Sequence, residues 1–383
     1  MRIAADINIP CIDSACTELG ELRFYDSRYA GQLQQALQGA DVLLCRSTIR
    51  VGPETLEGSN VRFVATATSG TDHLDVEGLT SAGINVASAA GSNARSVAEY
   101  VIAAILDLMA RQVMEASACS IGIVGVGHVG SQVMELSEAL GFHVYLNDPP
   151  REDRGETHAG NHSFVPLPQV LKSDIVSLHV PLTDTGFHPT RGLMSAEHFG
   201  IMRDNTVFVN TARGDVMNTA ACMEFARRGA AVLDVFPGEP EIDPELLNAV
   251  DIATPHIAGH SLDGKLLGTQ MLYDALCEYL GRVPTWRHEQ YLPQAPALVP
   301  HTLATANAYE QIAPIVHAAY NVTNDDAALR TLVQLPPETR GGYFSRLRAE
   351  YAVRREFHRI DVHASHLSNE ASEMLRALGF RLR

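Results

Sequence analysis

Short apolar, β-branched runs alternate with amphipathic stretches along most of this chain, and this alternation predicts a parallel α/β sheet. Before residue 90 the expected strands are "RIAAD", "ADVLLC", "VRFVAT" and "INVAS". A helical pattern with Ala, Leu and Ile on its buried face then runs from residue 96 to about residue 111. A second series of expected strands follows, separated mostly by helical segments: "SIGIVGV", "HVYLND", "DIVSLHV", "TVFVNT", "AAVLDV" and "DIATP".

The rhythm is lost from about residue 290, where the Pro-rich stretch "YLPQAPALVP" predicts a linker into a further unit. A length of 383 residues is itself typical of two or three domains. The last part, residues 340–383, holds nine Arg against five carboxylates. Because these acids are interleaved and no aromatic platform is visible, a small accessory or dimerisation domain is favoured over nucleic-acid binding.

Composition narrows the class of protein. The formal net charge of −16 argues against a general nucleic-acid or membrane-surface binder, because both partners are anionic. Six cysteines are scattered without a C-x-x-C pair, which favours reduced thiols in a cytoplasmic protein. Asp6 interrupts the region where a signal peptide needs an apolar core, and the most apolar helix carries Glu99 and Asp107. We therefore expect a soluble, cytoplasmic protein.

The stretch "GIVGVGHVG" has the spacing G-x-G-x-x-G of a dinucleotide-binding loop. Gly125 permits the tight turn, Gly127 lets backbone N–H groups reach a pyrophosphate, and Gly130 allows close helix–strand packing. The context supports this interpretation over a tight turn without a nucleotide, because an apolar strand precedes the loop and a helical pattern, residues 131–140, follows it. His128 and Val129 complete the loop.

Asp148 ends the next expected strand, eighteen residues beyond Gly130. An acid there accepts hydrogen bonds from the adenosine ribose and repels a 2′-phosphate, which predicts NAD as the cofactor. Arg151 and Arg154 follow closely. Their positive charges suit a 2′-phosphate, so they weaken the preference for NAD over NADP.

Three consecutive strands are followed by polar residues: Arg213 after the first, Asp234 and then Glu239 after the second, and His256 after the third. Parallel sheets bind ligands beyond the carboxyl ends of their strands, so these side chains are expected to converge. The set suits oxidation of a 2-hydroxy acid. His256 removes the hydroxyl proton, Glu239 fixes the imidazole tautomer, and Arg213 offers a planar fork to the substrate carboxylate.

A metal site is the alternative for the pair His256 and His260. Gly259 makes helical i,i+4 geometry doubtful and no helix-borne acids frame the pair, so no metal is expected.

Together these residues resemble the D-2-hydroxyacid dehydrogenase family, and the likeness extends over nearly the whole chain. Within the family, the chain is most similar to the branch that acts on 4-phospho-D-erythronate, with "DPPREDRG" and the extra C-terminal unit as the more discriminating features. The other resembling segments are "ADVLLCRST", "FVATATSGTDHLD", "GSNARSVAEYV", "GIVGVGHVG", "VLDVFPGEPEID" and "TPHIAGHSLDGK".

The resemblance implies two Rossmann-like, doubly wound parallel-sheet domains and a small C-terminal α+β dimerisation domain. The substrate-binding, flavodoxin-like domain is split over residues 1–93 and 259–289, the NAD-binding domain covers residues 94–258, and residues 290–383 form the homodimer contact. The implied reaction oxidises 4-phospho-D-erythronate to (R)-3-hydroxy-2-oxo-4-phosphooxybutanoate with NAD, a step of pyridoxal 5′-phosphate (vitamin B6) synthesis.

The resemblance also assigns site residues by position. The catalytic set is Arg213, Glu239 and His256, and the substrate positions are Ser47, Thr68 and His260. Arg46, beside Ser47, suits a phosphate because a dianion needs a positive partner, with ordinary solvated charge as the alternative. The NAD positions are Gly125, Gly127, His128, Val129, Gly130, Asp148, Val180, Thr211, Ala212, Asp234 and Gly259.

One position departs from the family pattern. The residue after Gly259 is usually a Tyr that contacts substrate, and here it is His260. This departure leaves open a dehydrogenase for another substrate, such as a phosphoglycerate or an unphosphorylated acid. A second alternative is an NAD-sensing binding or corepressor protein, because such proteins retain this fold and the Arg–Glu–His set. Arg50 and Lys265 are further candidates for the phosphate, although ordinary solvated charge is favoured for both.

Overall fold

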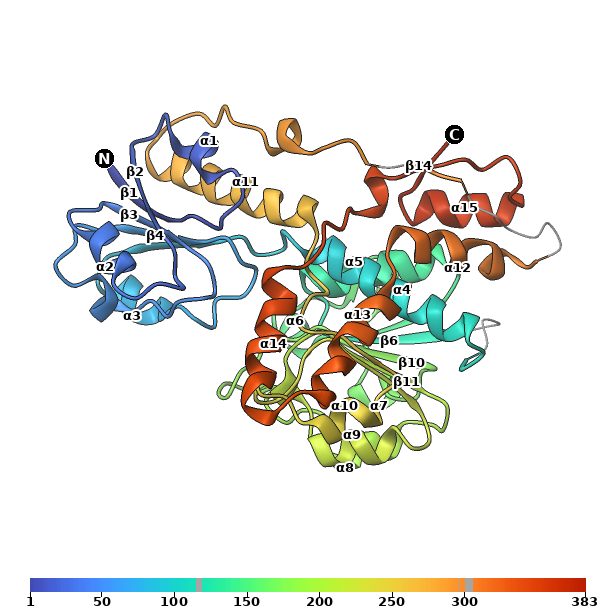
Figure 1. Cartoon of the computed structure of the whole chain (residues 1–383). Coiled ribbons are helices and arrows are strands. Elements are labelled where there is room, and N and C mark those ends of the chain that lie inside the picture. Colours follow the sequence, from blue (N-terminus) through green and yellow to red (C-terminus); the bar gives the residue numbers. More distant parts are fainter. Residues whose placement is uncertain (115–118, 296, 300–305) are drawn as a thin grey trace. The chain divides into compact units, whose positions relative to one another are not determined.

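The structure is a computed structural model that describes residues 1–114, 119–295, 297–299 and 306–383. Its chain forms two compact units (Figure 1). Unit 1 comprises residues 1–93 and 261–294, and unit 2 comprises residues 94–260 and 295–383. The boundaries proposed for three separate domains stay a prediction, and two residues of the proposed linker, 296 and 300, lie outside the described residues.

Unit 1 is built on a five-stranded parallel sheet with the strand order β2-β1-β3-β4-β5. This 2-1-3-4-5 order is that of flavodoxin-like sheets, with a topological switch point between β1 and β3. The four strands expected from the sequence are confirmed. The strands are β1 (Arg2–Asp6), β2 (Glu21–Tyr25), β3 (Val42–Cys45), β4 (Phe63–Thr66) and β5 (Asn85–Ser88).

Helices flank this sheet, and the longest, α11 (Leu262–Tyr279), comes from a later part of the chain and packs against it. Its side chains Leu272 and Leu276 share a core with Ile3 and Val42 of the strands. The remaining helices of unit 1 are α1 (Ile12–Cys16), α2 (Gln32–Leu37), α3 (Val76–Ser81) and the 3₁₀ turns η1 (Pro53–Leu56) and η3 (His288–Tyr291).

Unit 2 contains a six-stranded parallel sheet with the order β13-β12-β11-β10-β6-β7, so its switch point lies between β6 and β10. All six strands of the second predicted series are confirmed. They are β6 (Ser120–Val124), β7 (His143–Asn147), β10 (Ile175–Leu178), β11 (Val207–Asn210), β12 (Ala230–Leu233) and β13 (Ile252–Ala253). A two-stranded hairpin, β8 (His158–Ala159) and β9 (His162–Ser163), lies between β7 and β10 in the chain.

The helix α4 (Ala94–Ala110) is almost wholly buried and confirms the helix expected at residues 96–111. It packs against α5 (His128–Ala139) and shares one core with the strands. The other helices of this part are α6 (Pro149–Asp153), α7 (Leu167–Val170), α8 (Ala196–Ile201), α9 (Thr219–Phe225), α10 (Pro244–Ala249) and the 3₁₀ turn η2 (Gly214–Val216).

The C-terminal residues combine helices with a small parallel sheet, which confirms the α+β expectation. They are not packed as a free-standing body: Ile312 and Phe357 lie in the core with α4, and Leu329 and Phe344 lie in the core on the other face of the six-stranded sheet. The elements are β14 (Ala297–Leu298), α12 (Ala308–Ala319), α13 (Val322–Arg330), η4 (Thr331–Gln334), α14 (Pro337–Ala349), η5 (Phe357–Arg359), β15 (Asp361–Val362), α15 (Asn369–Ala377) and β16 (Arg381–Leu382).

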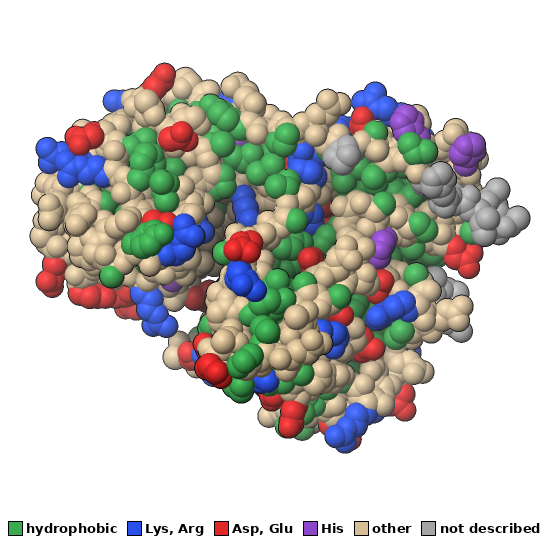
Figure 2. All heavy atoms as spheres, in the orientation of Figure 1, with side chains coloured by type: hydrophobic (Ala, Val, Ile, Leu, Met, Phe, Trp, Pro, Cys, Tyr) green, Lys and Arg blue, Asp and Glu red, His purple; other side chains and the backbone are tan. Residues whose placement is uncertain are grey.

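Charged side chains of both signs are interspersed on the face drawn in Figure 2, where the coloured atoms form no continuous basic patch. Among the described helices, none is long and apolar enough to cross a membrane.

Candidate active site

The glycine loop joins β6 to α5 at the switch point of the six-stranded sheet. Gly125 has φ +87°, and a Cβ there would lie 2.8 Å from the backbone of His179. A Cβ on Gly130 would lie 2.0 Å from the carbonyl oxygen of Gly125. A Cβ on Gly127, by contrast, would meet no protein atom within 4 Å. The fold itself therefore requires Gly125 and Gly130, whereas Gly127 leaves open space at the start of α5 that suits a pyrophosphate.

Asp148 follows β7 and connects this loop to α6. Its carboxylate accepts hydrogen bonds from the N–H groups of Val126, at 2.7 Å, and Arg151, at 3.1 Å. Arg151 and Arg154 both pair with Glu156, at 2.6 and 3.1 Å. The hydrogen bond from Arg151 is the main cause that lowers the pKa of Glu156. Both guanidinium groups thus share the one carboxylate of Glu156, which reduces their positive charge without cancelling it.

His256 and Glu239 form a hydrogen-bonded pair, with 2.7 Å between Nδ1 of the imidazole and Oε2 of the carboxylate. The other oxygen of Glu239 accepts the N–H of Phe236 at 2.8 Å. Burial alone raises the pKa of Glu239, but the hydrogen bond and charge of His256, the Phe236 N–H and the Arg348 charge together lower it below its ordinary value. Glu239 is therefore a carboxylate at neutral pH, and it directs Nδ1–H of the imidazole toward itself.

The loop at residues 254–260 carries His256 in an unusual backbone conformation, with φ +55°. Such a conformation persists only where its surroundings hold it. Asp234, at the end of β12, does so with a fully buried carboxylate that accepts hydrogen bonds from the Thr254 hydroxyl and from the N–H groups of Ile257 and Ala258, at 2.7 to 3.0 Å. The N–H of His256 itself donates to the backbone oxygen of Asp234 at 2.7 Å.

Arg213 lies just beyond β11, the strand between β10 and β12. Gly214 packs directly on the backbone of Phe236 and Pro237, since a Cβ there would lie 2.0 Å from the carbonyl carbon of Phe236. This contact sets Arg213 beside the turn that carries Glu239. The ends of β11, β12 and β13 thus place Arg213, Glu239 and His256 along one edge of the sheet.

Comparisons with known proteins agree with this geometry. Residues 95–258 match the family described as D-isomer specific 2-hydroxyacid dehydrogenase, NAD binding domain. Residues 291–379 match a domain of unknown function, DUF3410. The chain is 42% identical to the erythronate-4-phosphate dehydrogenase of Marinobacter nauticus, with 100% of both chains covered. It is 43% identical to that of Salinibacter ruber, over 93% of this chain and 92% of the relative.

The chain belongs to the erythronate-4-phosphate dehydrogenase family. This result confirms the family expected from the sequence and, with the matched domain, an NAD-dependent dehydrogenase. Solved structures support the fold. The D-lactate dehydrogenase of Aquifex aeolicus is similar with a TM-score of 0.60 at 24% identity, covering 73% of this chain and 96% of that one. The 3-phosphoglycerate dehydrogenase of Entamoeba histolytica has a TM-score of 0.61 at 21% identity, covering 73% and 95%.

The predicted substrate residues of unit 1 lie at the carboxyl ends of neighbouring strands. Arg46 and Ser47 follow β3, and Thr68 follows β4. Arg46 donates through Nε to the fully buried carboxylate of Asp6, at 3.1 Å across the switch point between β1 and β3. Asp6 was not predicted at this site, because its pairing with Arg46 depends on β1 lying beside β3.

His260 stands where the family usually has Tyr. It lies at the end of the His256 loop, where its N–H donates to the backbone oxygen of Ile257 at 2.8 Å. Its ring meets Tyr351 edge to face, with 5.8 Å between the ring centroids. Ser47, Arg50 and Lys265 are exposed. Their part in substrate binding stays a prediction.

The other predicted NAD positions border the glycine loop or the ends of β10 and β11. Val180 touches Gly125, and Ala212 donates its N–H to the side chain of Asn210 at 3.0 Å. Thr211 is hydrogen-bonded to His179, whose burial lowers its pKa to about 3, so this imidazole is neutral. His128 and Val129 begin α5, and Gly259 precedes His260. Their contacts with NAD stay predictions.

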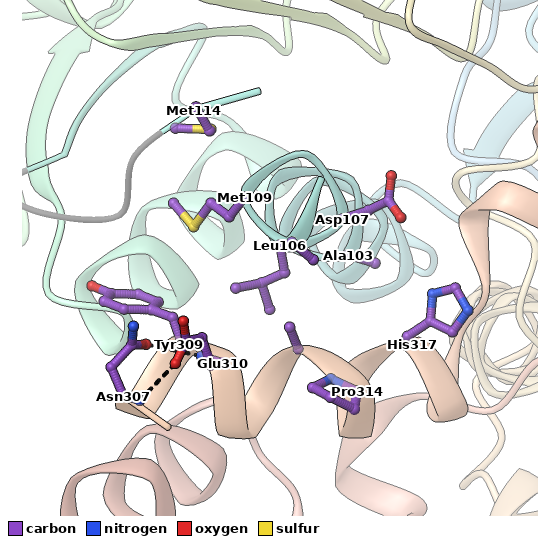
Figure 3. A pocket seen from close by; sticks show the side chains of 12 residues that line it. Ala103, Leu106, Asp107, Met109, Met114, Asn307, Tyr309, Glu310, Pro314 and His317 are labelled. Atoms are coloured by element: carbon purple, nitrogen blue, oxygen red, sulfur yellow. Dashed lines mark hydrogen bonds between the residues drawn. The ribbon is translucent and has the colours of Figure 1, made fainter. Parts of the chain in front are cut away.

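A separate pocket of about 490 Å³ lies between α4 and α12 (Figure 3) and contains none of the predicted site residues. Leu106 and Met109 of α4 face Tyr309 and Pro314 of α12 there. Within the part of the chain that the structure describes, no group of three His, Cys, Asp or Glu residues is placed to hold a metal ion.

Proposed function

We propose that this protein oxidises 4-phospho-D-erythronate to (R)-3-hydroxy-2-oxo-4-phosphooxybutanoate with NAD, as a step of pyridoxal 5′-phosphate synthesis. The proposal is supported by relatives named erythronate-4-phosphate dehydrogenase that match over the full length of the chain. It also rests on residues of this chain that suit each part of such a substrate.

The observation that carries the proposal is the 2.7 Å pair of His256 and Glu239. Because Nδ1–H points to the carboxylate, Nε2 is left to accept the proton of the substrate hydroxyl, and the negative charge of Glu239 stabilises the imidazolium that results. NAD, when bound, would accept the hydride from the carbon that carries this hydroxyl. The buried carboxylate of Asp234 holds the loop so that the imidazole keeps its place.

Two arginines match the two anionic ends of the substrate. Arg213 offers its fork to the carboxylate and polarises the carbonyl that forms. Arg46, oriented by Asp6, is the proposed partner of the phosphate, with the hydroxyls of Ser47 and Thr68 as further donors.

The direct test is NADH formation by the purified protein with 4-phospho-D-erythronate, 3-phosphoglycerate and D-lactate in parallel. We expect the first to give the highest kcat/KM. Faster turnover of 3-phosphoglycerate would favour the alternative substrate that His260 leaves open, and turnover of none by folded protein would contradict an enzymatic role.

We further propose that the protein is a cytoplasmic homodimer formed through residues 290–383. The support is the resemblance of the C-terminal unit to a dimerisation domain, together with six cysteines that are all free thiols. Light scattering of the intact protein tests the dimer, and a monomeric mass at micromolar concentration would contradict it.

A further inference from the structure

The segment between α14 and α15 runs back along unit 2 (Figure 1) and contacts the loop that carries His256. Arg354, which is 5% exposed, donates from Nη2 to the carbonyl oxygen of Ala258 at 2.6 Å and to that of Ser96, the third residue of α4, at 2.7 Å. The N–H of Ala258 is held by Asp234 at 3.0 Å. Ala258 is therefore held on both sides of its peptide backbone. Asp234, after β12, accepts its N–H, and Arg354 donates to its carbonyl oxygen.

A second contact reaches the end of the same loop. Tyr351 packs edge to face on His260, and its hydroxyl donates to Asp325 of α13 at 2.8 Å. Tyr320 donates to the same carboxylate oxygen at 3.0 Å, and its ring lies 4.3 Å from the guanidinium carbon of Arg354. Asp325, Tyr320 and Tyr351 thus form one hydrogen-bonded group beside the arginine, with Tyr320 buried and the other two partly buried.

If the buried Arg354 side chain served packing alone, it would lower the stability of the fold compared with an apolar residue. A buried guanidinium loses its hydration, and an apolar side chain of similar volume fills such a space at no such cost. Moreover, Nε and Nη1 of Arg354 have no hydrogen-bond partner among the described residues. What the charge does provide is a fixed double hydrogen bond between the catalytic loop and the start of α4.

We propose that Arg354 and Tyr351 are positioning residues for the dehydrogenase reaction. Arg354 holds the His256 loop in its left-handed conformation through the Ala258 carbonyl, and Tyr351 sets the plane of the His260 ring on the substrate side. The C-terminal unit, which matches a domain of unknown function, thereby takes part in the active site without touching the reacting atoms. This inference rests on the proposed function of His256 and His260.

Arg340 provides a matched control. It also belongs to the C-terminal residues and donates to two backbone carbonyls, those of Leu335 at 3.0 Å and Val333 at 3.3 Å. These carbonyls lie at the end of η4, before α14, and not in the His256 loop. Arg340→Met therefore removes the same kind of contact without removing a contact of the loop.

The test combines turnover with hydrogen exchange of the backbone amides in residues 254–260. For Arg354→Met we expect kcat to fall about 10- to 100-fold and exchange in this loop to accelerate, with partial recovery in Arg354→Lys. We expect Arg354→Met and Arg340→Met both to lower Tm, but Arg340→Met to leave kcat and loop exchange unchanged. For Tyr351→Leu we expect KM for the hydroxy acid to rise about tenfold, with Tyr351→Phe close to the wild type because the ring remains.

Equal losses of Tm in both arginine variants with kcat and loop exchange unchanged in both would overturn the proposal. The exchange measurement needs no substrate, so the two proposals fail separately. If the wild type does not oxidise 4-phospho-D-erythronate but Arg354→Met still loosens the loop, the substrate is wrong and the positioning role stands.

Discussion

The polar residues of the candidate active site are held by neighbours that the sequence does not reveal. The convergence of Arg213, Glu239 and His256 could be expected because each follows a recognisable strand, and their catalytic roles stay predictions. The place of Asp6 could not be expected, because its pairing with Arg46 depends on β1 lying beside β3. Asp234 was predicted as an NAD position, and its contact with NAD stays a prediction. In the structure both of its carboxylate oxygens accept hydrogen bonds from the His256 loop.

Asp234→Asn tests this hold on the loop. The asparagine amide has one oxygen that can accept hydrogen bonds and one NH₂ group that can only donate. One of the buried backbone N–H groups therefore faces another donor and loses its hydrogen bond. We expect about 2 kcal/mol less stability in urea unfolding and a lower kcat, with KM for NAD changed less. A variant with wild-type stability and kcat would show that the carboxylate does not position the loop.

Glu239→Gln separates the charge of Glu239 from its shape. The amide retains a hydrogen-bonding group near Nδ1 but not the charge that stabilises imidazolium, so we expect kcat to fall roughly 100-fold. Because the pKa of Glu239 is lowered in the folded protein, its charge stabilises the fold above the ordinary carboxyl pKa of about 4.3, and that stability is lost as pH falls through the lowered value. We expect Glu239→Gln to lack this loss of stability in acid unfolding. An acid transition identical to that of the wild type would show that the Glu239 charge does not stabilise the fold.

At the scale of elements, strands with regular apolar runs were recognised and irregular ones were not. β2 was missed because it is an edge strand whose sequence, "ELRFY", carries Glu21 and Arg23 and is only partly buried. The strands β14, β15 and β16 have two residues each and give no periodic signal. Arg354 and Ala258 are 96 positions apart in the sequence, so no local sequence pattern predicts their contact.

The helix α4 carries a buried acid whose ionisation limits stability. Burial and the neighbouring Glu356 raise the pKa of Glu99 to about 8, although Arg95 and the N–H of Phe357 lower it in part. The folded state therefore binds a proton that the unfolded state has released above about pH 4.3, so stability falls as pH rises toward 8, by up to about 1.4 kcal/mol per pH unit.

Glu99→Gln is expected to flatten this decline between pH 5 and pH 8, as measured by urea unfolding at several pH values. Glu224→Gln, at an exposed position paired with Arg227, is the matched control and is expected to keep the wild-type slope. A wild-type slope in Glu99→Gln would show that Glu99 is not the titrating group.

In the whole molecule, the C-terminal residues are integrated into unit 2, which the sequence did not reveal, and the boundary proposed at residue 290 stays a prediction. Its residues Ile312, Phe357, Leu329 and Phe344 complete both cores that flank the six-stranded sheet. A chain that stops at residue 294 leaves these cores exposed, so we expect it to lose cooperative unfolding and NAD binding. A soluble, cooperatively folded fragment that binds NAD would contradict this view of the unit.

In the proposed reaction, His256 takes the proton from the hydroxyl of a bound phosphorylated hydroxy acid. The initial rate of NADH formation from 4-phospho-D-erythronate by His256→Asn tests this role, alongside a fluorescence titration of the same variant with NADH. We expect a loss of kcat on the order of 10³-fold with cofactor affinity nearly unchanged. Turnover within a few-fold of the wild type would contradict it.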